Sequence, residues 1–272
     1  MSISVLTIVK SRLPALVNLL KGLELNTTLP QELVVVHMNE KKSDLKSDLF
    51  AVRSFELWSD VALPLAEARN FARQMSASEN MIFIDVDCVP AGNLIRIYSE
   101  SFLASNKLWA GQVRYLKKSA TQTPGFLEKL DALSTPDPVR SNIDQMSYEL
   151  FWSLNFACNK KTYDRIGGFD LGFQGYGAED TDFSFSAREA GVPIESSMSV
   201  VYHQYHPSYD PPLNHFKDIV KNALRFYSKW KHWPMGGWLK KFEALELIRW
   251  EDDNITILRS PDEHEIQLAL KV

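Results

Sequence analysis

Residues Met81–Asp87 read MIFIDVD, an apolar run that ends in two aspartates separated by one valine. A short apolar run bounded by polar residues predicts a buried β-strand, and we expect Pro90 to end it. Successive side chains of a strand alternate between its two faces. The spacing therefore predicts that Asp85 and Asp87 share one face at the carboxyl end of the strand, with Val86 on the other.

The segments on the N-terminal side of this strand alternate between strand and helix patterns. Short apolar runs predict strands at 3–9, 32–38 and 55–58, and apolar residues at helical spacing predict helices at 13–25 and 65–75. A strand, a helix and a second strand in this order form a right-handed crossover between parallel strands. The alternation predicts an α/β fold, a Rossmann-like three-layer sandwich with helices on both faces of a mainly parallel sheet.

The C-terminal side continues this alternation less regularly. We expect helices at 94–103, 181–190 and 215–230 and strands at 109–116, 150–157 and 199–202. The segment 119–147 is rich in Ser, Thr, Pro and Asp. We interpret it either as an irregular loop, of the kind that forms active-site lids, or as a partly helical excursion.

A glycine-rich loop with four acids, Asp170–Asp182, reads DLGFQGYGAEDTD. Five of the twelve glycines fall between Gly167 and Gly177, and a helical pattern follows at once. Glycine lets the backbone turn tightly or approach a ligand closely, and carboxylates beside it can bind hydroxyls, bind a metal or act as a base. The alternative is a set of turn glycines followed by Asp180 as the helix N-cap.

The composition excludes several classes of protein. With 24% charged residues and a net charge of −4, the chain is typical of globular proteins and lacks the basic excess of nucleic-acid binders. Two cysteines, Cys88 and Cys158, form neither a disulfide framework nor a zinc site. The sequence shows no signal-peptide layout and no apolar run of about 18 residues, so we expect a cytoplasmic protein.

The aspartate pair is a candidate metal site. Two carboxylates that face the same way repel each other, and a divalent cation with oxygen ligands, Mg²⁺ or Mn²⁺, would relieve this at Asp85 and Asp87. The alternative is that one aspartate caps the next segment. His203 and His206 follow a predicted strand, and an imidazole ligand would favour Mn²⁺. Because His203 ends that strand directly, we rank it ahead of His206.

Four stretches together resemble the GT-A glycosyltransferases of the large family-2 class. They are SVLTIV at 4–9, AEARNFA at 66–72, the D-x-D pattern at 85–87 and the glycine-rich loop at 167–182. The last is similar to the galactosyltransferase-type C-terminal signature, in which Ile-Gly-Gly-Phe-Asp precedes Gly-aromatic-Gly-x-Glu-Asp. The resemblance covers roughly residues 2–206 and implies the GT-A form of the α/β sandwich.

The resemblance also implies three groups of site residues. It assigns to the nucleotide-sugar donor Thr7, Val9, Arg69, Asn70 and Asp85. It makes Asp87 and His203 ligands of Mn²⁺ or Mg²⁺, and Asp85 contacts either this metal or the ribose. It makes Asp180 the general base of an inverting enzyme, with Glu179 beside it on the acceptor.

Two positions depart from the family pattern. Ala178 stands where the signature usually has a second glycine, which narrows the backbone freedom there. Asn39 ends the second predicted strand, where many relatives carry an acid. The resemblance therefore leaves the identity of the nucleotide base open.

Three further residues are candidates on chemical grounds. Aromatic rings stack on the apolar faces of sugars, so Trp152 and Tyr176 are candidate acceptor-binding residues, with core packing as the alternative. Asn155 lies in a strand-like segment where an apolar residue would cost less to bury. We expect it to hydrogen-bond the donor sugar or diphosphate, or else only a neighbouring backbone group.

These features predict a metal-dependent glycosyltransferase that moves a sugar from UDP-hexose or UDP-N-acetylhexosamine to a hydroxyl of a saccharide or glycolipid acceptor. Inversion follows from the resemblance at Glu179 and Asp180. A retaining enzyme and a non-catalytic sugar-binding protein of the same fold are the alternatives. A nucleotidyltransferase would carry a glycine-rich phosphate loop after the first strand, and residues 10–14, KSRLP, contain no glycine.

The chain is expected to divide near residue 210. The predicted catalytic domain, 1–210, consists of a nucleotide-sugar half at 1–110 and an acceptor half at 111–210, and an extension of helices and strands follows at 211–272. That extension carries four of the seven tryptophans, interleaved with lysines: Trp230, Trp233, Trp238 and Trp250. It would either cover the sheet or bind a membrane surface, and the second case would place the protein at the inner face of the membrane.

Overall fold

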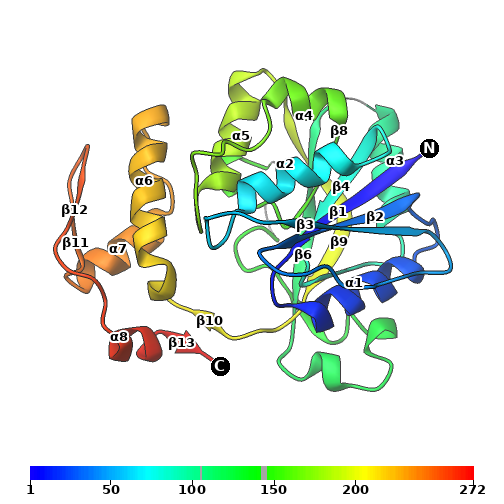
Figure 1. Cartoon of the computed structure of the whole chain (residues 1–272), viewed down its shortest axis with the longest axis horizontal. Helices are drawn as coiled ribbons and strands as arrows, with labels where there is room; N and C mark the ends of the chain where they lie inside the picture. Colours follow the sequence, from blue (N-terminus) through cyan, green and yellow to red (C-terminus); the bar gives the residue numbers. More distant parts are fainter. Residues whose placement is uncertain (105, 142–145) are drawn as a thin grey trace.

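The structure, a computed structural model, describes residues 1–104, 106–141 and 146–272. In this part of the chain, the centre is a nine-stranded sheet in the order β3-β2-β1-β4-β8-β6-β9-β5, with β7 paired to β6 (Figure 1). The strands are β1 (Ile3–Val9), β2 (Glu32–Met38), β3 (Ala51–Leu57), β4 (Asn80–Ile84), β5 (Cys88–Pro90), β6 (Leu108–Leu116), β7 (Ser134–Pro136), β8 (Asn155–Asn159) and β9 (Ile194–His203).

Most of these strands share one direction. The strands β1, β2, β3 and β4 are mutually parallel, and β6 and β9 run the same way. Only β5, β7 and β8 run in the opposite direction. The expected mainly parallel sheet is confirmed. Since β1, β4 and β9 point the same way, their carboxyl ends lie at the same edge of the sheet.

Helices cover both faces of the sheet, which confirms the three-layer sandwich. On one face, α1 (Leu13–Glu24) and α3 (Leu94–Ala104) pack on an aliphatic core. On the other, α2 (Leu65–Met75), α4 (Lys160–Ile166) and α5 (Glu179–Glu189) enclose a core rich in phenylalanine. Figure 1 shows these three helices above the sheet and α1 below it.

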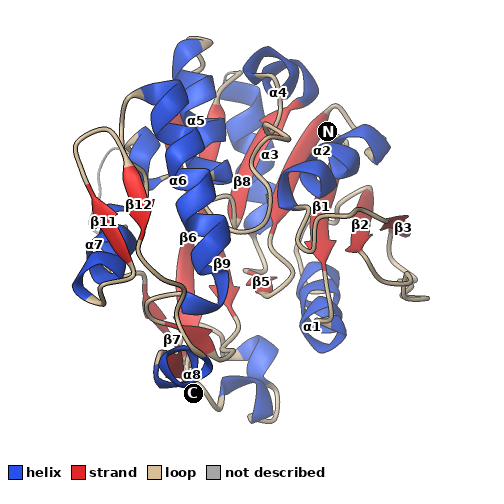
Figure 2. Cartoon of the chain, turned by 60° about the vertical axis from the view of Figure 1, so that its left-hand side comes forward, coloured by secondary structure: helices blue, strands red, loops and turns tan. Residues whose placement is uncertain are grey.

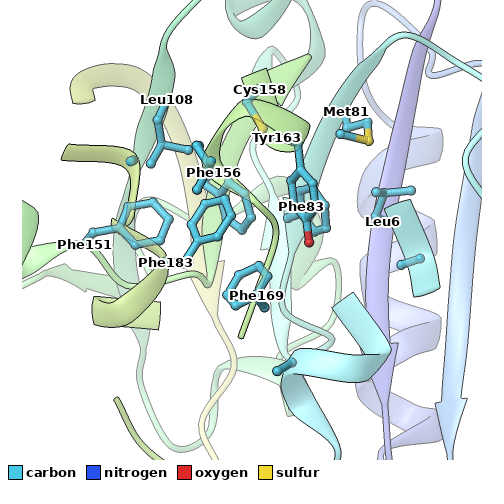
Figure 3. Close-up of a cluster of buried hydrophobic side chains, with 14 of the residues drawn as sticks. Leu6, Met81, Phe83, Leu108, Phe151, Phe156, Cys158, Tyr163, Phe169 and Phe183 are labelled. Carbon is cyan, nitrogen blue, oxygen red and sulfur yellow. The ribbon is translucent and has the colours of Figure 1, made fainter. Parts of the chain in front are cut away.

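The phenylalanine core anchors the glycine-rich loop at both of its ends. Phe169 precedes the loop and Phe183 lies in α5, and their rings stack at 4.4 Å. Phe83 of β4 and Phe156 of β8 stack at the same separation (Figure 3). Phe156 also contacts both Phe169 and Phe183. Burying several large rings together stabilises this region strongly, so the loop is held by the sheet that carries the aspartate pair.

The expectation of one strand over Met81–Asp87 is wrong at its end. Strand β4 stops at Ile84, and residues 85–87 form a turn that leads into β5. The backbone N–H of Asp85 donates to the carbonyl of Leu154, and the N–H of Cys88 donates back to the carbonyl of Asp85. These hydrogen bonds close the turn, so alternation along a strand does not apply to the two aspartates.

Pro90 does not end the strand that contains Met81, because that strand stops at Ile84 and Pro90 is the last residue of the separate strand β5. Strand β5 is the last in the sheet order and pairs only with β9. An edge strand tolerates proline because the missing N–H faces away from the sheet.

Other boundaries differ in smaller ways. Strands β3 and β9 begin several residues earlier than predicted, and α4 was not expected. The strand expected at 150–157 begins only at Asn155, after the 3₁₀ turn η3 (Tyr148–Leu150). The segment 119–147 contains two further 3₁₀ turns, η1 (Ala120–Gln122) and η2 (Phe126–Glu128), besides β7. This favours the partly helical interpretation, although residues 142–145 lie outside the described part.

The chain from Ser208 onwards builds a second group of elements with an apolar core of its own. They are η4 (Leu213–His215), α6 (Phe216–Trp230), α7 (Gly236–Ala244), α8 (Glu263–Leu268), the pair β11 (Ile248–Trp250) with β12 (Ile255–Ile257), and the pair β10 (Ser208–Tyr209) with β13 (Leu270–Lys271). The division of the chain into domains at 210 stays a prediction.

The four tail tryptophans are only partly exposed. Trp233, Trp238 and Trp250 pack against the core of this C-terminal group, and Trp230 packs against Phe185 of α5 and Phe226 of α6. This packing does not support the expectation that the tryptophans form a membrane-binding patch. Within the described residues, no helix combines the length and the apolar character needed to cross a bilayer.

Candidate active site

The turn at 85–87 lies where the carboxyl ends of several strands meet. It follows β4, Arg12 lies just beyond β1, and His203 is the last residue of β9. The backbone N–H of Gln204 donates to the carbonyl of Asp87 at 2.7 Å, which ties the end of β9 to the turn. The carboxyl edge of an α/β sheet is the usual place for a ligand.

Three side chains at this edge form a compact group of metal-ligand type. Asp87, His203 and His206 each offer one ligand atom, and the three atoms lie within 4.8 Å of one another. Nε2 of His203 is 3.5 Å from one oxygen of Asp87, and Nε2 of His206 is 3.4 Å from the other. The sequence ranked His203 first, and the structure brings both histidines to the aspartate.

The group fits a divalent cation in its chemistry and its spacing. Neighbouring ligands of an octahedral ion with bonds of about 2.1 Å are about 3 Å apart, and the observed separations require only small adjustments. One carboxylate with two imidazoles suits Mn²⁺ better than Mg²⁺, since nitrogen is the softer donor. Asp85 lies outside this group, so its expected contact with the metal stays a prediction.

The pKa values of two of these ligands favour metal binding. Burial acts to raise the pKa of Asp87, but the hydrogen bond from His206 and the charges of His203 and Arg12 outweigh it, and the pKa falls to about 2. Burial lowers the pKa of His203 despite the charge of Asp87. At neutral pH the aspartate is therefore ionised and this imidazole is neutral, as metal ligands must be.

Arg69 connects the aspartate turn to the glycine-rich loop. It is 6% exposed. Its Nη1 lies 3.1 Å from Oε1 of Glu179, and its Nη2 lies 3.5 Å from Oδ1 of Asp85. Its guanidinium group also stands over the ring of Phe169 at 5.1 Å. Arg69 is thus a buried residue of α2 that pairs with acids from two other segments.

Replacing Arg69 with alanine should lower the free energy of unfolding by about 3–5 kcal/mol, because it leaves Glu179 buried without its cation. Urea denaturation measures the change. Arg96→Ala is the matched control, since it removes an exposed pair with Glu100 in α3 and should cost less than about 0.5 kcal/mol. Equal losses in the two variants would contradict a structural role for the buried pair.

Asp180 lies in the first turn of α5, and it is not the N-cap. The cap is Ala178, whose φ of 69° is in the left-handed region. That conformation costs a non-glycine residue about 1–2 kcal/mol, which accounts for the glycine usual in the family signature. One carboxylate oxygen of Asp180 accepts the N–H of Thr181 at 2.7 Å. The helix-cap alternative for Asp180 is therefore wrong.

The environment of Asp180 makes it basic. Burial raises its pKa to about 7, and the neighbouring charge of Glu179 adds to this effect, whereas Arg69 opposes it. A carboxylate with a pKa near the working pH is suited to general-base catalysis. Burial and the adjacent acid thus outweigh the positive end of α5, which on its own would lower the pKa.

The other two acids of this turn are engaged elsewhere. Glu179 pairs with Arg69 and also accepts the N–H of Gly177 at 3.1 Å. Asp182 is 1% exposed and accepts hydrogen bonds from Lys229 and Trp230 of α6. Of these three acids, Asp180 is the one that forms no ion pair with a cation among the described residues.

Two predicted donor-binding amides serve the fold. Asn155 is 1% exposed; it accepts from the hydroxyl of Tyr98 and donates to the carbonyls of Gln112 and Ser199. Its amide has partners within the sheet, so the structure favours the interpretation in which it bonds only neighbouring groups. Asn70 accepts the N–H of Phe169 at 2.9 Å and donates to its carbonyl at 2.8 Å, which secures the turn before the loop.

The remaining predicted residues lie around these groups. Thr7 and Val9 are buried in β1. The ring of Trp152 is covered by the guanidinium of Arg140 at 4.2 Å, and Arg140 forms a buried ion pair with Asp137. Tyr176 is 36% exposed. Desolvation and the charges of Glu179 and Asp180 raise the pKa of its phenol.

Sequence reasoning missed Arg12 and His215. Arg12 forms an ion pair with Asp87, and the ring of His215 stacks on Tyr176 at 4.6 Å. The signal for Arg12 was present, because it follows the first strand at the edge where ligands bind. No local signal pointed to His215, which reaches the loop from far along the chain.

Comparison with known proteins relates the C-terminal part of this site to galactosyltransferases. Residues 140–207 match the family described as the N-terminal domain of galactosyltransferase. Over 206 residues the chain is 22% identical to validoxylamine A glucosyltransferase of Streptomyces hygroscopicus subsp. limoneus, covering 63% of this chain and 44% of that protein. The enzyme of subsp. jinggangensis matches equally, with 47% of its length covered. The chain thus spans less than half the length of these curated relatives.

Two solved structures share the fold. TarS of S. aureus, residues 1–349, superposes with a TM-score of 0.54 at 14% identity over 84% of this chain and 66% of that one; it has also been solved with UDP. GalNAc-T7, solved with UDP, GalNAc and Mn²⁺, superposes with a TM-score of 0.58 at 16% identity over 90% of this chain and 54% of that one. At such identities the similarity establishes the architecture and no more.

Proposed function

We propose that this chain, which has the GT-A glycosyltransferase fold, transfers a sugar from a nucleotide-sugar donor to a hydroxyl of an acceptor. The observation that carries the proposal is that two groups of different chemistry, one of metal-ligand type and one basic, are connected through a buried arginine. Asp87 with its two histidines is of metal-ligand type, and Asp180 is a partly exposed carboxylate of raised pKa. Arg69 connects them by pairing with both Asp85 and Glu179.

The first group serves the leaving diphosphate. Asp87, His203 and His206 would hold Mn²⁺ or Mg²⁺, which when bound supplies Lewis-acid stabilisation of the negative charge that gathers on the diphosphate. Arg12 beside Asp87 contributes a fixed positive charge at the same edge, and a guanidinium matches the geometry of phosphate oxygens. We assign the nucleotide-sugar half of the chain, 1–110, to this task.

The second group serves the acceptor. Asp180 takes the proton of the attacking hydroxyl, a role that contributes about 10²- to 10⁴-fold in typical enzymes. Glu179 is held by Arg69 and orients the acceptor beside the base, and Tyr176 supports the sugar ring from the loop. We propose an inverting displacement, in which the base acts on the side of the sugar opposite the leaving group. We assign this task to residues 111–210.

The donor that we propose is UDP-hexose or UDP-N-acetylhexosamine, and the acceptor is a saccharide or glycolipid. GalNAc-T7 was solved with UDP, GalNAc and Mn²⁺, and TarS with UDP. The curated relatives are glucosyltransferases by name. These ligands belong to those proteins, and they support the same class of donor for a chain with the same fold and a metal-type group.

A donor panel tests this function. The protein is incubated with UDP-, GDP-, ADP- and dTDP-sugars in Mn²⁺ and, as a control, in EDTA, and the released nucleotide is measured. The expected result is metal-dependent release from a UDP-sugar, and NMR of the glycoside product then gives the anomeric outcome. If no nucleotide sugar is bound or cleaved with metal present, the proposal fails. A product of unchanged anomeric configuration would instead make the enzyme retaining.

Activity should rise with pH through about 7, the pKa to which burial raises Asp180. A general base must be ionised, so kcat/KM is expected to be full above this value and to fall about tenfold per pH unit below it. The profile is measured at saturating Mn²⁺, with donor binding followed in parallel. If donor binding stays constant while kcat/KM falls below pH 7, the fall is due to protonation of the base. A kcat/KM that does not change across pH 7 contradicts the role of Asp180 as the base.

A further inference from the structure

Glycines of the glycine-rich loop face the C-terminal helices. A Cβ atom added at Gly172 would lie 2.0 Å from the guanidinium of Arg225, and one at Gly175 would lie 2.2 Å from the carboxylate of Asp218. Both contacts are far below van der Waals separation. Two of the loop glycines therefore leave room for side chains of α6. The sequence had suggested instead that such glycines let the backbone approach a ligand closely. Figure 2 shows α6 running beside α5, which follows the loop.

Asn222 of α6 binds the middle of the loop. It is fully buried, and its Nδ2 donates to the carbonyls of Gln174 at 3.0 Å and Gly177 at 2.9 Å, with that of Tyr176 at 3.4 Å. Since all three neighbours are acceptors, only the donor end of the amide can face them. One side chain thus fixes the path of four consecutive loop residues.

The same helix also holds both ends of the loop. Nη2 of Arg225 lies 3.0 Å from both oxygens of Asp170, where the loop begins. Nζ of Lys229 and Nε1 of Trp230 bind the buried carboxylate of Asp182, where it ends. Glu179 and Asp180 lie between these fixed points, so α6 constrains the loop on either side of the candidate base.

A chain of hydrogen bonds leads from Asn222 to the site. Asn222 holds the carbonyl of Gly177 at 2.9 Å, and the N–H of Gly177 donates to Oε2 of Glu179 at 3.1 Å. The other oxygen of Glu179 pairs with Arg69, which reaches Asp85. A displacement of Gly177 would therefore shift Glu179 directly and Asp180 with it.

We propose that Asn222 is a positioning residue for sugar transfer, and that helix α6 is thereby a part of the active site. The inference rests on the proposed function. A misplacement of about 1 Å at a reacting group can cost about 10²-fold in rate. Removing the amide frees three loop carbonyls while leaving Asp87 and its histidines untouched, so the base is disturbed and the metal group is not.

The test compares Asn222→Ala with Val220→Ala in the full chain. Val220 is equally buried in α6 but packs into the C-terminal apolar core, so its truncation destabilises the helix without releasing the loop. For Asn222→Ala we expect kcat for transfer to fall at least about tenfold, with KM for the donor and affinity for Mn²⁺-UDP within about twofold. Val220→Ala should keep kcat within about threefold at a matched loss of melting temperature.

Hydrogen exchange gives a second readout that does not depend on activity. The amides of residues 174–177 should exchange faster in Asn222→Ala than in Val220→Ala. Equal exchange, or equal kcat at equal stability, overturns the proposal. If the wild type transfers no sugar, the proposed function fails, and the exchange comparison alone decides whether Asn222 holds the loop.

A milder variant covers the case in which Asn222→Ala does not fold. The side chain of Arg225 is 44% exposed, so Arg225→Ala should fold while releasing Asp170 at the start of the loop. We expect the same pattern at a smaller scale, a loss in kcat of about threefold with an unchanged donor KM. A change in donor KM without a change in kcat would contradict a positioning role for α6.

Discussion

Asp87→Ala is expected to abolish metal-dependent donor binding and to lower kcat/KM by about 10³-fold or more, since Lewis-acid stabilisation of a leaving group is worth several kcal/mol. Asp87 is the one carboxylate of the metal-type group and contacts both of its histidines. Its pKa is lowered to about 2 by the hydrogen bond and charges around it, which outweigh burial. It is therefore ionised throughout the working range, and its removal takes away the only anionic ligand of the group.

Titration calorimetry of Mn²⁺ and of UDP in the presence of Mn²⁺ measures this loss. Asp87→Asn keeps the size of the side chain and removes its charge, so it should weaken metal binding nearly as much as alanine does. Asp48→Ala, an exposed acid in the loop after β2, is the control for net charge and should bind normally. Unchanged affinity in Asp87→Ala would remove this residue from the metal site.

Asp180→Asn is expected to leave donor binding intact and to lower kcat for transfer by about 10²- to 10⁴-fold, the usual contribution of a general base. Asparagine has nearly the same shape and can still accept the N–H of Thr181, which Asp180 accepts at 2.7 Å. It cannot take a proton from the acceptor. The variant therefore separates base catalysis from the structure of the first turn of α5.

The controls lie on the same helix. Glu189→Gln removes an exposed carboxylate at the other end of α5 and should leave kcat unchanged. UDP affinity in Mn²⁺ should agree between Asp180→Asn and the wild type within about twofold, since the metal group is not altered. Near-normal turnover in Asp180→Asn would show that another group takes the proton or that the enzyme is retaining.

The regular elements could be predicted because their signals are local. Strands β1 and β2 are buried along their whole length and appear in the sequence as unbroken apolar runs, as expected for parallel strands covered on both faces. The helix α1 shows its apolar spacing and its early proline. The turn at 85–87 gives no such signal, because its apolar and polar residues alternate as in a strand while the N–H of Cys88 donates to the carbonyl of Asp85 and turns the chain.

The candidate site was predictable only in part. Patterns of acids and histidines pointed to Asp87, His203 and Asp180, because carboxylates and imidazoles that follow predicted strands or a glycine-rich loop offer metal ligands and bases where ligands of an α/β sheet bind. The same reasoning placed Asn155 in the site, and it is a sheet residue whose amide bonds Tyr98 and two carbonyls. A buried polar residue gives the same signal whether its partner is a ligand or a neighbouring strand.

By itself, the sequence determined the α/β sandwich, the two acidic stretches at 85–87 and 170–182 and the ligand types that they offer. Only the tertiary structure decided which of these groups meet. It paired Arg69 with Glu179 and Asp85, brought His206 to Asp87 and set Asn222 against the loop glycines. The periodicity of a segment shows which of its side chains face solvent and which face the core. Ion pairs and buried hydrogen bonds depend on distances between segments, and only the packed fold fixes these distances.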